Sequence, residues 1–178
     1  LDQASAHVGT TRGVKAPEFE SVPFDVRKPD ILSHFGVEFM AKARKVLLAG
    51  ESWVSAATHY KGFDQFASVT FHLGAEPLVE ALKGSRFQLR YMPAHEAQEH
   101  FPLTLEGLSE YDAVILSDIG ANTLLLHPET WLRSKPMPNR LRLLKRYVET
   151  GGGLMMVGGY LSFQGINGSA RYRGTPVE

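Results

Sequence analysis

The 178-residue chain contains no cysteine. This absence excludes disulfide bonds, thiolate zinc sites and iron–sulfur clusters, and it excludes any reaction that needs a cysteine thiolate from this chain. The chain also lacks a charge bias, because Lys plus Arg and Asp plus Glu each total 19. Without a net positive field, neither nucleic acid nor an anionic membrane surface is an expected partner.

Long apolar runs and cofactor motifs are absent as well. No apolar stretch approaches the ~20 residues that span a bilayer, and no basic segment followed by an apolar one opens the chain. A cytoplasmic protein is therefore expected. Neither a dinucleotide fingerprint nor a phosphate-binding loop occurs, and the histidines lack metal-ligand spacing, so we expect no cofactor and no metal. The glycines at 151–153 and 158–159 predict a helix end and a tight turn.

The composition that is present, 43% hydrophobic, is enough for one globular domain with a core. Residues 1–39 contain three prolines and no lasting hydrophobic period, which predicts a flexible N-terminal extension. The alternative is an arm that docks on a neighbouring subunit. Residues 40–178 form the predicted domain, and since nothing in the last four residues signals a domain end, we expect it to be incomplete at the C-terminus.

Short apolar runs alternate with helical patterns along this domain. Strands are predicted at 46–50, 87–92, 113–117 and 154–157, and helices at 75–83 and after the N-cap residue Asn139. This alternation predicts an α/β fold: an open, doubly wound, mainly parallel sheet with helices on both faces.

Ligands of such sheets bind beyond the carboxyl ends of the strands, so the residues that follow each predicted strand are the candidates for a site. A predicted loop at 58–64 follows the first strand and adds three of them. In chain order the candidates are Glu51, Ser52, His59, Lys61, Asp64, His95, Asp118, Asn122, Tyr160 and Gln164. Together they would bring carboxylates, imidazoles, hydroxyls and amides to one rim.

Several candidates have more than one interpretation. Glu51 is a general base or the cap of a helix formed by the next residues. Ser52 is a nucleophile only if a base such as His59 lies beside it. The two histidines, His59 and His95, are acid–base groups or metal ligands. Asp118 binds a ligand hydroxyl or closes an Asx turn.

Several motifs recur together and in order. They are Gly50-Glu51-Ser52-Trp53, His59 with Lys61-Gly62-Phe63-Asp64, His95-Glu96-Ala97-Gln98, Ser117-Asp118-Ile119-Gly120-Ala121-Asn122-Thr123, Pro138-Asn139-Arg140-Leu141, and Gly151-Gly152-Gly153-Leu154 through Gly158-Gly159-Tyr160-Leu161-Ser162-Phe163. Over roughly residues 44–178 the chain resembles the glutamine amidotransferase-like cytoplasmic proteins of bacteria. These proteins belong to the class I glutamine amidotransferase-like superfamily, which has a flavodoxin-like fold.

The resemblance implies the fold more than the activity. Class I amidotransferases carry Gly-x-Cys-x-Gly at a strand-to-helix turn, where this chain has Gly158-Gly159-Tyr160-Leu161-Ser162. Tyr160 thus stands in the place of the nucleophile, and glutamine hydrolysis is not expected. Tyr160 orients a substrate through its phenol or simply fills the turn by stacking.

Two functions remain open. One is a thiol-independent hydrolase or transferase acting on a small polar metabolite or sugar. In it Glu51, His59 and Tyr160 would be catalytic, and the other candidates would bind substrate. The other is a non-catalytic small-molecule-binding or regulatory domain. A homo-oligomer is also expected, because an incomplete sheet leaves an edge or an apolar face uncovered.

Overall fold

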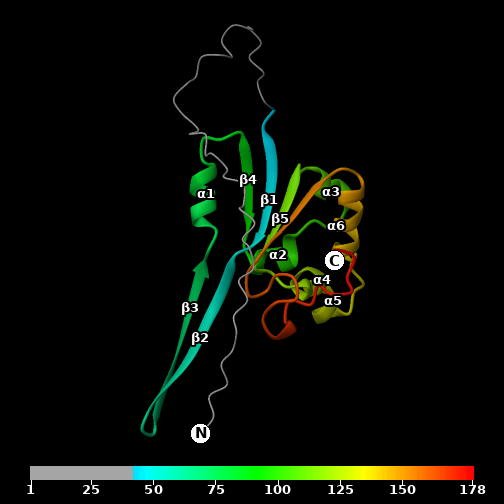
Figure 1. The fold of residues 1–178 in the computed structure, drawn as a ribbon. Helices are drawn as coiled ribbons and strands as arrows, with labels where there is room; N and C mark the ends of the chain where they lie inside the picture. Colours follow the sequence, from blue (N-terminus) through cyan, green and yellow to red (C-terminus); the bar gives the residue numbers. More distant parts are fainter. Residues whose placement is uncertain (1–41) are drawn as a thin grey trace, which may run out of the picture. The chain divides into compact units, whose positions relative to one another are not determined.

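The computed structural model describes residues 42–178, so the expected extension at 1–39 lies outside the described residues (Figure 1). The strands are β1 (Arg44–Gly50), β2 (Ser52–Lys61), β3 (Asp64–Leu73), β4 (Phe87–Met92), β5 (Ala113–Ser117) and β6 (Gly153–Val157). The helices are α1 (Glu76–Leu82), α2 (Ala94–His100), α3 (Leu105–Ser109), α4 (Ala121–Leu125), α5 (Pro128–Arg133) and α6 (Arg140–Glu149), followed by a short 3₁₀ turn η1 (Ile166–Gly168).

Four strands form one parallel sheet in the order β4-β1-β5-β6. In this register Val46 of β1 lies opposite Leu89 of β4 and Ala113 of β5. The predicted α/β class and its parallel sheet are thereby confirmed. Of the strands in this sheet, β4 follows β1 in the chain and lies on one side of it, and β5 comes next and lies on its other side. The topological switch point therefore lies between β1 and β5.

The two faces of this sheet are covered unequally. Successive strand residues point to opposite faces. Leu47 and Ala49 of β1 enter the core cluster, which α2, α3, α4 and α6 complete. Leu48 points to the other face, where it lines a pocket with Ala75 and Leu78 at and beside α1. Helices thus lie on both faces: α2, α3, α4 and α6 pack on one, and α1 lies on the other (Figure 1).

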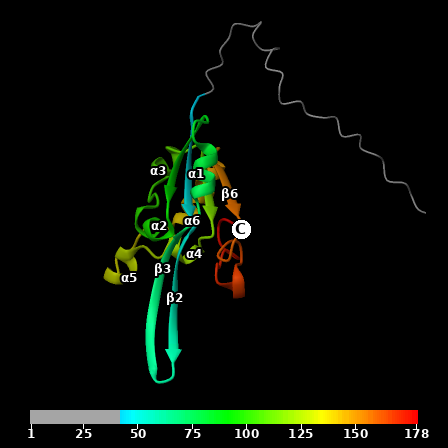
Figure 2. The ribbon, with the colours of Figure 1, turned by 90° about the vertical axis from the view of Figure 1, so that its left-hand side faces the viewer.

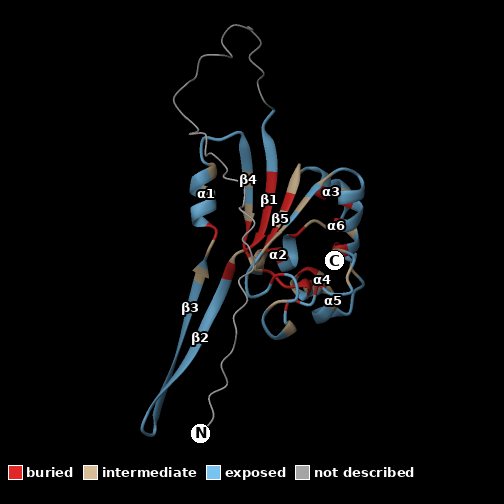
Figure 3. Cartoon of the chain, in the orientation of Figure 1, coloured by how far each residue is buried: buried red, intermediate tan, exposed pale blue. Residues whose placement is uncertain are grey.

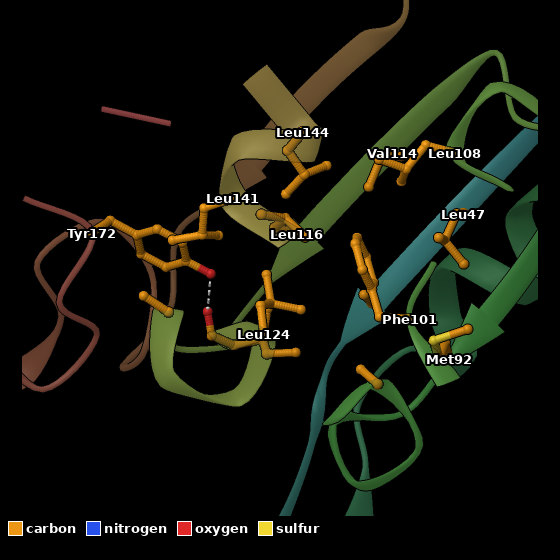
Figure 4. Close-up of a cluster of buried hydrophobic side chains, with 14 of the residues drawn as sticks. Leu47, Met92, Phe101, Leu108, Val114, Leu116, Leu124, Leu141, Leu144 and Tyr172 are labelled. Carbon is orange, nitrogen blue, oxygen red and sulfur yellow. Dashed lines mark hydrogen bonds between the residues drawn. The ribbon is translucent and has the colours of Figure 1, made fainter. Parts of the chain in front are cut away.

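The core on the better-covered face is continuous from β4 to the C-terminal segment (Figure 4). Its largest members are Leu47, Met92, Phe101, Leu108, Val114, Leu116, Ile119, Leu124, Leu141, Leu144, Tyr147 and Tyr172. The Tyr172 hydroxyl donates to the Ile119 carbonyl at 2.7 Å, which ties residues after β6 to the end of β5. Burial raises the pKa of the Tyr172 phenol, so this donor stays protonated.

One charged side chain belongs to the core. Arg140, the first residue of α6, is 1% exposed. Its guanidinium donates to the carbonyls of Ala97, Gln98 and Glu99, in the last turns of α2, and to that of Leu124 in α4. Burial lowers the pKa of Arg140 to about 10, so the group still carries its charge at neutral pH. Arg140 therefore joins three helices through their backbone.

Helix α6 begins and ends as its sequence predicts. The Asn139 side chain accepts from the backbone N–H of Arg142 at 3.0 Å, an N-cap bond. At the other end, a Cβ on Gly152 would lie 2.2 Å from the Tyr147 ring, so only glycine fits as the chain turns back into β6. The predicted cap and the predicted glycine-rich helix end are both confirmed.

The expected loop at 58–64 is wrong. Residues 52–73 form an antiparallel hairpin of β2 and β3, which extends away from the parallel sheet in both views (Figures 1 and 2). Its residues are almost all exposed (Figure 3). Gly62 has a φ of 65° and starts a two-residue Gly-Phe connection, a pattern typical of a type II′ hairpin turn. Gly62 lies inside the segment that was predicted as a loop, and glycine is a signal of turns and of loops alike.

Candidate functional site

Glu51 occupies the first position after β1, at the switch point, in a left-handed backbone conformation with φ of 46°. Its amide donates to the Ser117 carbonyl at 2.9 Å, and its own carbonyl accepts from the Tyr91 hydroxyl at 2.8 Å. The Glu51 carboxylate accepts a short hydrogen bond from the Ser117 hydroxyl. The carboxylate is therefore held at a defined position between β1 and β5.

Asp118 repeats this arrangement at the end of β5. It is also left-handed, with φ of 45°. Its carboxylate accepts from the Leu161 amide at 2.6 Å, and its own amide donates to Ser162 Oγ at 3.2 Å. These two hydrogen bonds link Asp118, at the end of β5, to the segment after β6. Left-handed non-glycine residues are costly, and they cluster at functional sites.

The turn after β6 packs closely against Asp118. A Cβ on Gly159 would meet the Asp118 side chain at 2.7–2.8 Å, so glycine is required there for the approach. Tyr160 follows and is 74% exposed. No helix follows this turn directly. The chain continues through turns to η1, so the expected strand-to-helix turn is not formed in residues 158–165. Left-handed backbone occurs at Phe163 and not at Tyr160.

A pocket of about 410 Å³ opens beside Glu51, on the face of the sheet that α1 partly covers. Glu51 and Ser117 supply its polar end. Its remaining walls are mostly apolar and comprise Leu48, Gly74, Ala75, Pro77, Leu78, Ile115, Met155 and Val157. An apolar pocket with a few fixed polar groups is the usual form of a small-molecule site.

Tyr91 supports the pocket from β4. Its phenol has a raised pKa, first because of burial and then because of the negative charge of Glu51. The hydroxyl therefore remains a hydrogen-bond donor to the Glu51 carbonyl at neutral pH. Our sequence reasoning missed Tyr91, because only cross-strand pairing brings it beside Glu51, 40 residues away. It also missed Ser117 as the partner of Glu51, although both follow apolar strand runs.

Three other candidates, Ser52, His95 and Asn122, lie near the strand ends, and their surroundings differ. Ser52 is buried, and its Oγ accepts from the Ala94 amide at 2.8 Å, which fastens the start of α2 to the base of the hairpin. His95 is exposed on the first turn of α2, with Phe71 of β3 in edge contact at 5.2 Å. Asn122 is exposed on α4. Since Ser52 begins a strand, the helix that Glu51 was expected to cap does not exist.

Three candidates do not join the site. His59, Lys61 and Asp64 lie toward the tip of the hairpin. At ~3.3 Å per strand residue, His59 is about 26 Å along the chain from Glu51. The His59 ring stacks on Phe66 at 4.5 Å, and its Nε2 is 3.1 Å from Ser68 Oγ. The structure therefore separates His59 from Ser52 and from Glu51.

Gln164 is exposed and lines a second pocket of about 540 Å³, with Leu154, Met156, Phe163 and Tyr172 among its walls. This pocket lies on the opposite face of β6 from the one beside Glu51, because Met155 and Met156 point to different sides. Within residues 42–178, no group of three or more His, Asp or Glu side chains lies close enough to hold a metal ion.

Fold and site together define a class: an open α/β domain with a carboxylate, Glu51, at the switch point beside a mostly apolar pocket. The family model described as "Putative glutamine amidotransferase" matches residues 45–178, and the chain belongs to that family. The earlier resemblance is thus confirmed. No curated protein matches the chain significantly.

Two solved structures from Salmonella typhimurium share this fold. Cytoplasmic Protein STM3548 is 47% identical, with a TM-score of 0.72 over 75% of this chain and 54% of that one. Cytoplasmic Protein STM1381, from strain LT2, is 46% identical, with a TM-score of 0.70 over 74% of this chain and 54% of that one. The chain thus spans about half the length of these relatives. No helix in the described part of the chain combines the length and apolar character needed to cross a bilayer.

Proposed function

We propose that this chain is a cytoplasmic small-molecule-binding domain of the amidotransferase-like class, which does not hydrolyse glutamine through a covalent thioester. The observation that carries the proposal is the Glu51 carboxylate, held by Ser117 at the polar end of an otherwise apolar pocket. The absence of cysteine supports the second part, because the chain cannot supply the thiolate that such a route needs.

The chemistry of the pocket indicates its ligand. A carboxylate accepts hydrogen bonds from ammonium or hydroxyl groups, and Glu51 keeps an oxygen beyond the one that Ser117 uses. The walls formed by Leu48, Leu78 and Met155 favour an apolar part next to that polar group. The ligand class is thus a small polar metabolite, such as an amine or a sugar, with a donor group attached to a short apolar portion.

A thiol-independent hydrolase or transferase is the second candidate. It is favoured by the left-handed backbone at both Glu51 and Asp118, since such strain accumulates at catalytic positions. Glu51 would then act as the general base. The position of His59 on the hairpin leaves this reaction without the imidazole expected from the sequence.

Thermal shift against a panel of amines, amino acids and sugars tests the binding proposal. We expect at least one compound to raise the melting temperature of the wild type, and Glu51→Gln to lose most of that shift. Glu76→Gln is the matched control, because Glu76 is an exposed acid in α1 that does not line the pocket. Equal shifts in wild type and Glu51→Gln would refute the assignment of the pocket.

Turnover of the stabilising compound separates the two candidates. Binding without turnover favours the binding domain, whereas turnover lost in Glu51→Gln and kept in Glu76→Gln favours the enzyme. Glutamine supplied as substrate should release no ammonia above the buffer rate. Ammonia release by the purified chain would contradict the proposal directly.

A further inference from the structure

The hairpin of β2 and β3 has two chemically different faces. Directly opposite residues of an antiparallel pair point to the same side, and alternate residues point to opposite sides. The register therefore places Ser52, Val54, Ala56, Thr58, Tyr60, Gln65, Ala67, Val69, Phe71 and Leu73 on one side, which we call the apolar arm face. The polar arm face comprises Trp53, Ser55, Ala57, His59, Lys61, Asp64, Phe66, Ser68, Thr70 and His72.

All side chains of the hairpin that can carry a charge near neutral pH lie on the polar arm face. They are His59, Lys61, Asp64 and His72. The apolar arm face carries none, and seven of its ten residues are Ala, Val, Leu, Phe or Tyr. Such a sorting is typical of a sheet with one buried and one solvated face.

The apolar arm face is nevertheless open to solvent. Val54 is 60% exposed, Val69 70% and Tyr60 73%. These residues form a continuous strip along the hairpin, from its base near Leu73 to the turn at Gly62. Apolar residues that are exposed singly are scattered over a surface and do not align on one face. A continuous exposed apolar strip of this length therefore marks an interaction site.

The hairpin has little else to stabilise it. An isolated two-stranded hairpin is marginal in water and needs packing on one face. The contacts of this hairpin with the described domain are at its base, where Ser52 meets Ala94 and Phe71 meets His95. Beyond the base both strands project into solvent (Figures 2 and 3).

We propose that the apolar arm face packs against the same face of a second copy of this chain, forming a two-fold dimer through the paired arms. A partner that buries an unpaired charge against this face is disfavoured, and a second apolar arm face brings no such charge. The chain carries a net charge of zero, so two copies do not repel each other.

The geometry also determines how the two arms run. Packed sheets lie ~10 Å apart, which is less than the width of the α/β domain at the base of each arm. Parallel arms would make the two domains collide, so the arms run antiparallel. The two-fold axis then passes near Ala56 and Val69, which are paired in the middle of the hairpin.

The size of the contact sets its strength. Ten residues at ~3.3 Å give an arm about 33 Å long, and two strands give a face about 10 Å wide. Two such faces bury on the order of 700–1,000 Å² in total, which is below a permanent dimer interface. We therefore expect association that depends on protein concentration across the micromolar range.

A lysine in the middle of the apolar arm face tests the proposal. Val69→Lys buries an unpaired charge in the dimer, and we expect its dissociation constant to rise at least about 100-fold. Thr70→Lys is the matched control, because Thr70 is the next residue on β3, is β-branched and points to the polar arm face. Sedimentation velocity over a concentration series should show dimerisation in the wild type and in Thr70→Lys only.

Cross-linking provides a second test that disturbs the fold less. The chain has no cysteine, so a single introduced thiol is the only site for a bis-maleimide. Ala56→Cys and Ala57→Cys are neighbours on β2 that point to opposite faces. We expect cross-linked dimers from Ala56→Cys and at least about tenfold fewer from Ala57→Cys at equal concentration.

Three results would overturn the proposal. One is a wild type that stays monomeric at hundreds of micromolar. Another is a dimer that survives Val69→Lys, which would place the contact elsewhere. The third is an Ala56→Cys thiol that resists a mono-maleimide in monomeric protein, which would show that another segment of the same chain covers the face.

Discussion

The parallel sheet and the projecting hairpin are built from similar residue types, yet they obtain stability in different ways. In the sheet, Leu47, Val114 and Leu116 are at most 1% exposed, because crossover helices cover their face. In the hairpin, Val54 and Val69 are at least 60% exposed, because each strand has only its neighbour. A β-forming sequence therefore does not produce burial by itself. A covering layer is needed, and the hairpin lacks one within the described residues.

The largest effect is expected where the helices of the sheet domain are joined by a buried charge. Arg140→Met removes the donors to four backbone carbonyls, and it should lower the free energy of unfolding by roughly 3–5 kcal/mol. Arg142→Met, at an exposed position of the same helix, should stay within about 0.5 kcal/mol. Urea unfolding measures both. Equal losses would mean that Arg140 contributes no more than surface charge.

Valine truncation compares the two regions directly. Val114→Ala in β5 should cost about 2–3 kcal/mol, from lost burial and the cavity left behind. Val69→Ala in the hairpin should cost under about 0.5 kcal/mol when measured at low protein concentration, where association does not contribute. A comparable loss at Val69 would show that the monomer buries the hairpin.

A substitution at the strand ends should destabilise the protein, as one in the sheet core does and one in the hairpin does not. Gly159→Ala places a methyl group 2.7 Å from an Asp118 carboxylate oxygen and should cost about 1–2 kcal/mol. Gly158→Ala meets nothing within 4 Å and should be close to neutral. Thermal unfolding compares the pair. A tolerated Gly159→Ala would show that Asp118 moves freely and is not a fixed part of the site.

The smallest effect concerns the amino ends of the strands. The Arg44 guanidinium, 2.7 Å away, and then the Lys45 amide hold the pKa of Asp112 below its ordinary 3.8. The ionised Asp112 therefore adds stability above pH 3.8, and that contribution disappears as pH falls through the lower folded-state pKa. Asp112→Asn should unfold slightly earlier than wild type at pH 7, with the difference vanishing in strong acid. Because the pair is exposed, salt should shrink the difference too.

Local patterns predicted the parallel sheet well. The predicted strands at 46–50, 87–92, 113–117 and 154–157 coincide with β1, β4, β5 and β6 to within two residues. Three of these strands contain a short apolar run, and β4 alternates between apolar and polar residues. Both patterns are local signals that can be recognised without knowledge of distant segments. The hairpin was missed because its strands mix small, polar and aromatic residues, and Gly62 was interpreted as part of a loop.

The candidate site was predicted in part. The rule that ligands bind at strand ends selected Glu51 and Asp118 correctly as neighbours of the switch point. It failed for His59, Lys61 and Asp64, because the segment that carries them continues away from the rim as a strand. Their catalytic and binding roles, like those of the other candidates, stay predictions.

The residues of this chain, taken alone, reveal its α/β class, its four parallel strands, its family and its lack of a thiol nucleophile. Each of these rests on local periodicity, on composition or on motif order. Folding in three dimensions settled which groups meet. It set the Glu51 carboxylate against Ser117, 66 residues away, and gathered the uncharged residues of a hairpin on one face. Strand order and cross-strand register create these contacts, and both depend on pairings between segments that are distant in the chain.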